Sequence, residues 1–266
     1  EALKELSLVI RDGEKLGIIG ATGSGKSTLL YLLNALLRPA KGKVFLDGKD
    51  TANFKKADLL ELRQKVGLVF QYPEQQIFEE YVYEEVAFGP RNLGLDEAEV
   101  KNRVENALSR VGLPPQIFVR RDTASLSGGQ KRRLALAGIL GMGPRYLLLD
   151  EPTAGLDYEG RFVLLDYLIR LNLEQRTTIV MVSHNLAELL HVCDRIVLLN
   201  DGRIGIDVDA KLLLKYYEQI KELGFEPTKS LEVIAGLNRR NWGIDTSPKT
   251  PEEAGYLIAE KLKTRT

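Results

Sequence analysis

The sequence predicts an α/β protein built on a mostly parallel sheet, and two observations lead to this fold class. Short apolar runs of strand length alternate with amphipathic stretches of helix length along most of the chain. A glycine-rich segment, residues 20–28, lies between the apolar run 16–19 and a helical run from Thr28 to Leu37. A strand, a glycine loop and a helix in succession form the unit from which parallel sheets with flanking helices are built.

The elements expected before residue 80 surround that unit. Apolar alternation over residues 3–10 predicts a strand, which turns at residues 11–14 into the strand 16–19. Pro39 and Gly42 end the helix that follows the glycine loop. Beyond them we expect a strand at 43–48, a helix at 57–65, a strand at 66–70 and a polar loop at 71–78.

The middle of the chain predicts a helical insertion, because residues 80–125 hold helical patterns at 81–89 and 96–111 and almost no strand signal. We place this inserted subdomain at about residues 79–133. Alternation then returns, with a helix at 128–141, a strand at 145–149, a helix at 159–173, a strand at 177–182, a helix at 185–191 and strands at 195–199 and 203–206. The sequence therefore predicts one domain over residues 1–207 and a small helical C-terminal domain over residues 208–266.

Composition excludes several functional classes. Lys+Arg and Asp+Glu both count 37, so the formal net charge is zero and general nucleic-acid binding has no electrostatic basis. The single cysteine, Cys193, excludes an internal disulfide and a cysteine metal cluster and fits a reducing compartment. Because no apolar run approaches ~18 residues, we expect no membrane-spanning helix. The chain opens at Glu1 inside a strand-like pattern, so we expect further sequence before it.

The glycine loop is the first chemical signal. Gly20-Ala21-Thr22-Gly23-Ser24-Gly25-Lys26-Ser27-Thr28 matches the phosphate-binding pattern G-x-x-x-x-G-K-[ST]. Glycines let the backbone curl so that successive N–H groups point at phosphate oxygens, and the helix N-terminus adds partial positive charge. We expect Lys26 to reach the β- and γ-phosphates of a nucleotide and the Ser27 hydroxyl to bind Mg²⁺.

A second signal is the apolar run Tyr146–Leu149, which ends in Asp150 and Glu151. A buried strand with this ending places two carboxylates at the carboxyl edge of the sheet. We expect Asp150 to hold Mg²⁺ through water and Glu151 to act as the general base on the attacking water. Taken alone, the pair is equally compatible with a solvated strand end.

The third signal is Leu126-Ser127-Gly128-Gly129-Gln130, which precedes a helical run. Here the chain resembles the ATP-binding-cassette (ABC) ATPases, whose signature is Leu-Ser-Gly-Gly-Gln. By resemblance, Ser127, Gly128, Gly129 and Gln130 form a second phosphate receptor at a helix N-terminus. The resemblance implies the P-loop NTPase, RecA-like fold with an added antiparallel strand subdomain. We interpret the basic triplet 131–133 as a solvated helix face.

Further positions match this family in the expected order. Gln71 resembles the Q-loop glutamine, which reaches the metal and the water and senses the membrane partner. Asp157, in Ala154-Gly155-Leu156-Asp157, resembles the D-loop aspartate at the interface of two cassettes, and His184 resembles the switch histidine on the γ-phosphate. The family also carries an aromatic residue upstream of the first turn that stacks on adenine, and none is present there.

The family resemblance implies a mechanism and partners. Two cassettes pair head to tail, each ATP lies between one phosphate loop and the partner's signature, and hydrolysis reopens the pair. Gln-x-Pro-x-x-Gln over residues 71–76 and the stretch 130–138 resemble the ATPase subunits of energy-coupling factor importers and of cobalt and nickel importers. That branch implies a second, preferably non-identical cassette, a membrane scaffold subunit, a substrate-binding membrane subunit, and a peripheral position on the cytoplasmic face of the cell membrane.

Two questions stay open at this point. Tyr72, Ile77, Phe78, Tyr81 and Tyr83 either receive the scaffold's helices or pack the insertion against the core. The chain could also serve another ABC transporter class, or be a soluble ABC ATPase without a transport role. A DNA-repair ATPase is disfavoured because the interval between loop and signature holds no heptad run, and a ribosome-acting protein because the chain has one cassette.

Overall fold

The computed structural model describes residues 2–264, and its internal contacts divide the chain into two compact units. The first unit comprises residues 1–26 and 180–266, and the second comprises residues 27–179. Six strands form one sheet in the order β4-β5-β6-β1-β7-β8, and β6 belongs to both units. These strands are β1 (Lys15–Gly20), β4 (Val66–Val69), β5 (Tyr146–Asp150), β6 (Thr178–Val182), β7 (Arg195–Asn200) and β8 (Arg203–Asp209). The predicted mostly parallel α/β sheet is confirmed.

In the first unit, β1 and β7 run parallel, from the pair Leu16↔Arg195 to the pair Gly20↔Leu199. Their apolar side chains are buried on both faces, which is why both strands read as continuous apolar runs in the sequence. β8 pairs antiparallel with β7 across the turn at Asp201 and Gly202, whose φ angles are 47° and 77°. Two successive left-handed residues are the conformation that a tight hairpin requires.

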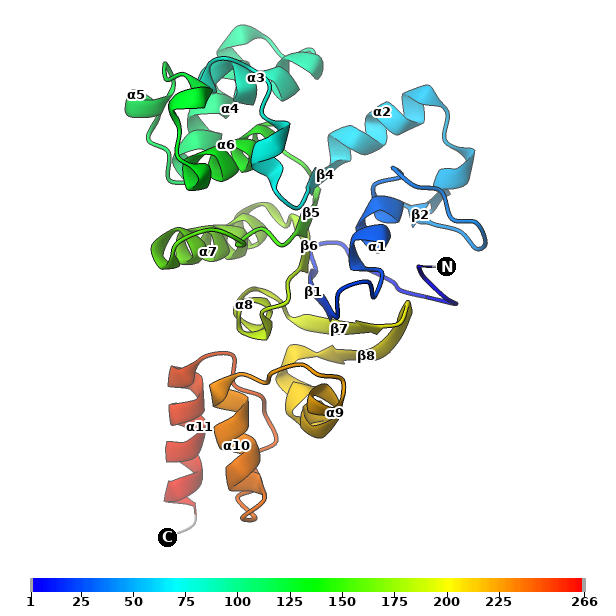
Figure 1. Ribbon diagram of the computed structural model, residues 1–266, viewed down its shortest axis with the longest axis vertical. Coiled ribbons are helices and arrows are strands. Elements are labelled where there is room, and N and C mark those ends of the chain that lie inside the picture. Colours follow the sequence, from blue (N-terminus) through cyan, green and yellow to red (C-terminus); the bar gives the residue numbers. More distant parts are fainter. Residues whose placement is uncertain (1, 265–266) are drawn as a thin grey trace. The chain divides into compact units, whose positions relative to one another are not determined.

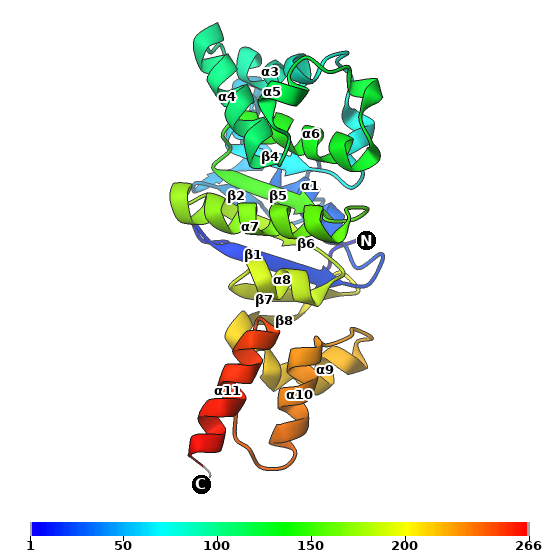
Figure 2. The same ribbon diagram turned by 90° about the vertical axis from the view of Figure 1, so that its left-hand side faces the viewer.

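The first unit is helical beyond β8. The helices there are the 3-10 helix η4 (Ala210–Tyr216), α9 (Tyr217–Glu222), α10 (Lys229–Asn238) and α11 (Pro251–Lys263), whereas α8 (Leu186–Val192) lies between β6 and β7. α10 and α11 lie side by side (Figures 1 and 2). They enclose a small core of Ile234, Ile244 and Ala254, against which Trp242 and Leu257 pack.

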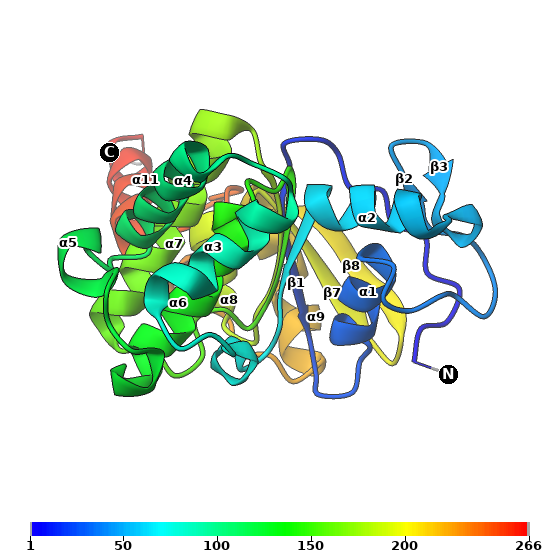
Figure 3. The same ribbon diagram turned by 90° about the horizontal axis from the view of Figure 1, so that it is seen from above.

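In the second unit, β4 and β5 run parallel, with Val69 opposite Leu149. The helix that begins this unit is α1 (Lys26–Leu33). The strands β2 (Phe45–Leu46) and β3 (Lys49–Asp50) form a separate antiparallel hairpin beside α2 (Lys56–Lys65), which the 3-10 helix η1 (Thr51–Asn53) precedes (Figure 3).

The expected helical insertion is a cluster of helices within the second unit (Figures 1 and 3). Its members are η2 (Pro73–Gln76), α3 (Val82–Asn92), α4 (Glu97–Arg110), α5 (Pro115–Phe118), η3 (Thr123–Ser125) and α6 (Gly128–Gly141). In α4 the buried residues are Val100, Val104, Ala107 and Leu108, a helical spacing that packs one face inward. The longest helix of the described residues, α7 (Tyr158–Gln175), follows β5 in the same unit.

Three details differ from the sequence-based expectation. Residues 3–10 form no strand, because their alternating apolar residues find no ladder partner among the described residues. α1 ends at Leu33 rather than Leu37, because Ala35 adopts a left-handed φ of 54°. The short helix α5 lies outside the expected helical patterns, and it begins at Pro115 because proline at the first helical position loses no hydrogen bond. Among the described residues, no helix is long and apolar enough to cross a membrane.

Candidate functional site

The phosphate-binding loop leaves the end of β1 in the first unit. Gly23 and Gly25 have φ angles of 81° and 100°, which only glycine adopts at low cost. The Lys26 Nζ donates to the carbonyl oxygens of Gly20 at 2.7 Å and Ala21 at 2.9 Å. The ammonium group therefore lies directly over its own loop, where phosphate oxygens of a nucleotide would replace the two carbonyls.

Close approach explains the glycine that ends β1. A Cβ at Gly20 would lie 2.4 Å from the Ser24 Oγ and 2.5 Å from the Leu199 carbonyl oxygen. The Ser24 Oγ is buried and finds no hydrogen-bond partner among the described residues. A buried hydroxyl in this state is costly unless a ligand supplies its partner. The loop is thus polar, tightly folded and incomplete by itself.

The second unit contributes the carboxylates. Asp150, the last residue of β5, is 3% exposed, and its Oδ2 has no hydrogen-bond partner in the described part of the chain. Burial, and after it the negative charge of Asp150, raise the pKa of Tyr31 on α1, so this carboxylate lies near the α1 helix. An acceptor-only oxygen that is buried without a donor is suited to a cation. The residues present therefore fit a magnesium ion, for which Ser27, at the start of this unit, would add a hydroxyl.

Glu151 and Gln71 follow neighbouring strands of the second unit. Because β4 and β5 are parallel and adjacent, both residues leave the same edge of the sheet. Glu151 is half-buried with a left-handed φ of 51°, and Tyr72, directly after Gln71, has a φ of 57°. Non-glycine residues rarely adopt this conformation, and where they do, it concentrates at functional sites.

His184 belongs to the first unit, directly after β6. The backbone N–H of Ser183 donates to the Ile18 carbonyl oxygen at 3.2 Å, so this chain segment runs beside β1. The buried Ser183 Oγ donates to Glu188 at 3.1 Å and accepts from the N–H of Asn185 at 3.0 Å, which fixes the backbone on both sides of His184. The imidazole itself is exposed, at the edge of the sheet from which the phosphate loop also leaves.

The signature segment caps α6. The Ser127 Oγ accepts from the N–H of Gln130 at 3.3 Å, and the Gln130 Oε1 accepts from the N–H of Ser127 at 2.9 Å. This reciprocal pair holds the first turn. A Cβ at Gly128 would meet no atom within 4 Å, and one at Gly129 would meet only Leu156 Cδ2, at 3.9 Å. The side of this helix N-terminus at Gly128 is therefore open, which leaves room there for a ligand of the kind that an anion receptor holds.

The structure corrects the interpretation of residues 131–133 as a solvated face. The Arg132 side chain is 7% exposed and pairs with Glu74, through Nε–Oε2 at 3.1 Å and Nη2–Oε1 at 3.3 Å. The sequence contained a signal for this burial. Arg132 precedes the buried Leu136 and Leu140 by one and two helical turns, so it lies on the apolar face of α6.

The residues considered for docking divide into two groups. Tyr72, Phe78 and Tyr81 are 49%, 62% and 45% exposed, and Phe78 meets the exposed Phe88 edge to face at 4.8 Å between ring centroids. Glu85 accepts from the N–H groups of residues 78 and 79, which anchors the loop on α3. Ile77 and Tyr83 are half-buried.

Comparison with known proteins agrees with this geometry. The ABC transporter family matches residues 3–154. The energy-coupling factor transporter ATP-binding protein EcfA2 of Caldanaerobacter subterraneus is 43% identical over 262 residues, which is 98% of this chain and 91% of that protein. The EcfA2 of Symbiobacterium thermophilum is 46% identical over 265 residues, which is 100% of this chain and 91% of that protein.

Solved structures give the same result. CbiO1 of Clostridium perfringens, part of the ABC transporter complex cbiONQ, has a TM-score of 0.74 and 35% identity, and the match covers 90% of this chain and 92% of that one. A dimeric post-hydrolysis state of the cassette MJ0796, bound to ADP and Pi, has a TM-score of 0.72 and 31% identity over 79% of this chain and 90% of that one. The fold agrees with these structures, and the family match together with the relatives over nearly the whole chain shows that the chain belongs to the ABC transporter family of ATP-binding proteins.

Proposed function

We propose that this chain is the ATP-hydrolysing subunit of an energy-coupling factor importer for vitamins or metal ions. The observation that carries the ATPase chemistry is the buried Oδ2 of Asp150, which lacks a partner among the described residues at the sheet edge that Glu151 also leaves. The transport role is supported by the EcfA2 relatives, because their similarity extends over nearly the whole chain rather than over the cassette motifs alone.

In this proposal the loop Gly20–Thr28 binds the phosphates of ATP. Lys26 exchanges its two carbonyl acceptors for β- and γ-phosphate oxygens, which places a fixed positive charge where negative charge develops. Glu151 removes a proton from the attacking water, and His184 donates a hydrogen bond to the γ-phosphate. The remaining catalytic contribution is position, because phosphoryl transfer requires an aligned nucleophile more than covalent assistance.

Three residues would hold Mg²⁺, namely Ser27, Gln71 and Asp150. Held there, the ion would supply positive charge against the phosphates of ATP during hydrolysis. Within the described residues, no group of three His, Cys, Asp or Glu side chains forms a metal site. A hydroxyl, an amide and one carboxylate, completed by nucleotide and water, are a set that magnesium accepts.

We further propose that the signature Ser127–Gln130 serves the nucleotide of a second cassette, with Asp157 at the junction. The open space around Gly128 supports this assignment, because the segment is formed as a receptor without a ligand of its own chain. ATP then bridges two proteins, and its hydrolysis removes the bridge. The second cassette is preferably a different chain. The pair acts at the cytoplasmic face of the membrane, on a scaffold subunit that works with a substrate-binding membrane subunit.

Substitution of the proposed base tests the chemistry. Glu151→Gln should reduce phosphate release by about a hundredfold or more, because a general base contributes on the order of 10²–10⁴. ATP binding, measured with a fluorescent analogue, should persist. A Glu151→Gln chain that hydrolyses ATP at the parent rate would refute the assignment of Glu151.

Purification from the native membrane in mild detergent tests the transport role. We expect a second, non-identical cassette and a small membrane scaffold protein to co-purify, identified by mass. Recovery of copies of this chain alone would leave the ATPase assignment intact and overturn the transport role. Phe78→Asp and Tyr81→Asp should abolish recovery of the scaffold, with the exposed Leu173→Asp on α7 as a matched control.

A further inference from the structure

The side chain of Arg132 contacts two loops besides its own helix, all within the second unit. It donates to both carboxylate oxygens of Glu74, and its Cζ lies 5.8 Å from the centroid of the Tyr72 ring. On another side it approaches Gly155, where an added Cβ would lie 2.9 Å from the Arg132 Nη1. The guanidinium is therefore enclosed by the segment after Gln71, by α6 and by the segment Ala154–Asp157.

Glu74 belongs to η2, the turn that directly follows Gln71. This turn begins at Tyr72 in a left-handed conformation and has no side-chain hydrogen bond at its N-cap. Its attachment to α6 therefore depends on side-chain contacts, among which the Glu74–Arg132 pair is both charged and largely buried, with exposures of 25% and 7%. Any displacement of η2 relative to α6 would have to break this ion pair or carry α6 with it.

On the other side, the position of Gly155 depends on Arg132. Gly155 has a φ of 72°, and its missing side chain leaves the space that the guanidinium fills. The next residue, Leu156, lies beside the signature segment, where a Cβ added at Gly129 would lie 3.9 Å from the Leu156 Cδ2. The planar, permanently charged guanidinium can hold two hydrogen bonds to one carboxylate while its face and edge contact other groups, which lysine cannot do.

We propose that Arg132 is a positioning residue for ATP hydrolysis, which sets the signature Ser127–Gln130 according to the position of the turn after Gln71. Arg132 touches neither ATP nor water in this proposal and acts through the first turn of α6. The inference rests on the proposed function, because the signature must receive a nucleotide for its position to affect the rate.

The test compares three variants in the intact transporter complex: Glu74→Gln, Arg132→Met and the double variant. Either single change leaves a buried polar group without its partner, so both should lower the melting temperature. The double variant removes both charges together, so no buried charge is left without a partner and part of the lost stability should return. The ATP hydrolysis rate of the double variant should nevertheless stay below that of the parent complex, by a factor on the order of ten to a hundred, because the signature is no longer held in place. Nucleotide affinity should change by less than about twofold, since the phosphate loop is intact.

Arg132→Lys and a matched ion pair provide the controls. Lysine keeps the charge but cannot bind both oxygens in the same plane, so Arg132→Lys should recover stability and only part of the rate. The pair Arg103–Glu99 lies in the same unit at 2.8 Å, with exposures of 32% and 40%, away from the signature. The double change Glu99→Gln and Arg103→Met should leave the rate unaltered. If the Glu74→Gln and Arg132→Met double variant recovers its rate together with its stability, the pair is merely structural and the proposal is wrong.

A second arm separates this inference from the proposed pairing of cassettes. When Lys26→Ala disables this chain's own loop, the remaining hydrolysis should depend on Arg132, because it uses this chain's signature. When the partner's loop lysine is replaced instead, the remaining hydrolysis should be insensitive to Arg132→Met. The reverse pattern would refute the shared site but retain the role of Arg132, and insensitivity in both arms would overturn that role.

Discussion

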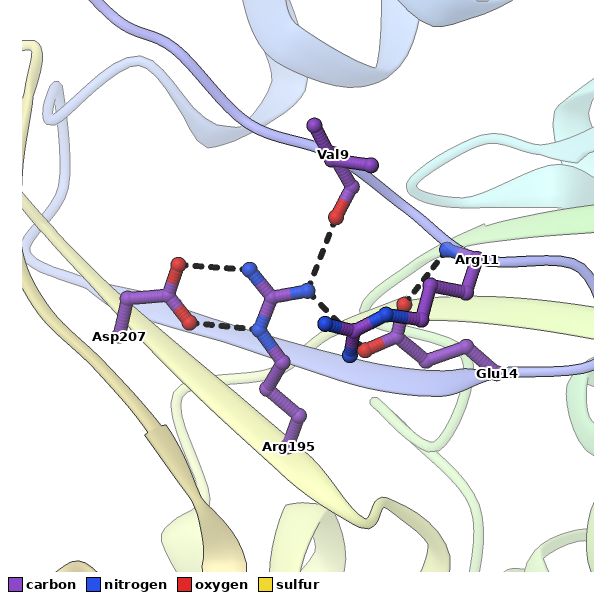
Figure 4. Close-up of polar contacts among 5 residues, drawn as sticks. All are labelled: Val9, Arg11, Glu14, Arg195 and Asp207. Carbon is purple, nitrogen blue, oxygen red and sulfur yellow. Dashed lines mark hydrogen bonds and ion pairs between the residues drawn. The ribbon is translucent and has the colours of Figure 1, made fainter.

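Arg195 joins three segments of the first unit, and its replacement gives a prediction whose size follows from burial. The Nε and Nη2 atoms donate to the two oxygens of Asp207, each at 2.6 Å, and Nη1 donates to the Val9 carbonyl oxygen at 2.9 Å and to Glu14 at 3.1 Å (Figure 4). The side chains of Arg195, Glu14 and Asp207 are 18%, 10% and 32% exposed. Arg195→Met removes all these bonds and leaves two carboxylates without their cation.

The free energy of unfolding that Arg195→Met should lose lies between two known limits. Breaking a buried ion pair costs about 3–5 kcal/mol, whereas an exposed pair contributes about 0–1 kcal/mol. Glu14 keeps its bond from the N–H of Arg11 at 2.7 Å, and Asp207 retains partial contact with water. We therefore expect Arg195→Met to lower the free energy of unfolding by about 2–3 kcal/mol.

The matched control is an ion pair of the same length that is exposed. Arg239 lies 2.7 Å from Glu218, and their side chains are 61% and 65% exposed. Arg239→Met should cost less than about 1 kcal/mol. Urea unfolding is followed by the fluorescence of Trp242, the single tryptophan, which packs within the same unit. If the two variants lost equal free energy of unfolding, the length of an ion pair rather than its burial would set its contribution to stability, and the reasoning would be refuted.

Three further predictions concern the Cys193 thiol, the loss of stability at acidic pH, and the signature. Burial raises the pKa of Cys193, so this thiol should resist a disulfide reagent at about pH 8 until denaturant is added, and stoichiometric labelling of the native protein would contradict this. Burial of Asp194 opposes its ionisation, but hydrogen bonds from Lys15 and Lys249 outweigh it and lower the pKa. The folded pKa then lies below the unfolded value of about 3.9, so the carboxylate stabilises the fold above that value and loses this contribution as pH falls through the folded pKa. Asp194→Asn should accordingly weaken the fall in the free energy of unfolding below about pH 5. An unchanged pH dependence would show that Asp194 does not contribute to it. Gly128→Ala meets no atom within 4 Å, so it should leave stability equal or raised by up to about 1 kcal/mol while it slows phosphate release, and full activity would argue against a receptor there.

Much of the fold could be predicted because its signals are local. The glycine loop, the apolar runs of β1 and β5 and the helical spacing of α4 are each readable within about twenty residues. The strand expected over residues 3–10 shows the limit of this approach. Alternation says that one face is apolar but not that a partner strand is present, and a ladder depends on residues far away in the chain.

The placement of the candidate site residues rests on a related argument. In a parallel sheet the ends of neighbouring strands meet at one edge, and β4 and β5 are such neighbours. The strand ending indicated this edge for Asp150 and Glu151, whereas Gln71 was assigned by resemblance to the family, and the roles of all three stay predictions. Arg132 could not be assigned in this way. Its partner Glu74 lies 58 residues earlier, and its charge favoured a solvated position over a buried one. Helical spacing from Leu136 placed it on the inner face, but only the partner makes such a burial tolerable.

Several residues of the candidate site carry a free-energy cost in the folded chain. The buried Asp150 Oδ2 and Ser24 Oγ find no partner among the described residues, and Glu151 adopts a conformation that costs free energy. A fold selected for stability alone would pair these oxygens. A ligand that gave either oxygen a partner would stabilise the folded chain, so the free energies of binding and folding are linked at each of these two positions. The same reasoning separates Arg132 from these residues. Its charge is already matched in the folded chain, so its contribution to hydrolysis is to hold position rather than to bind.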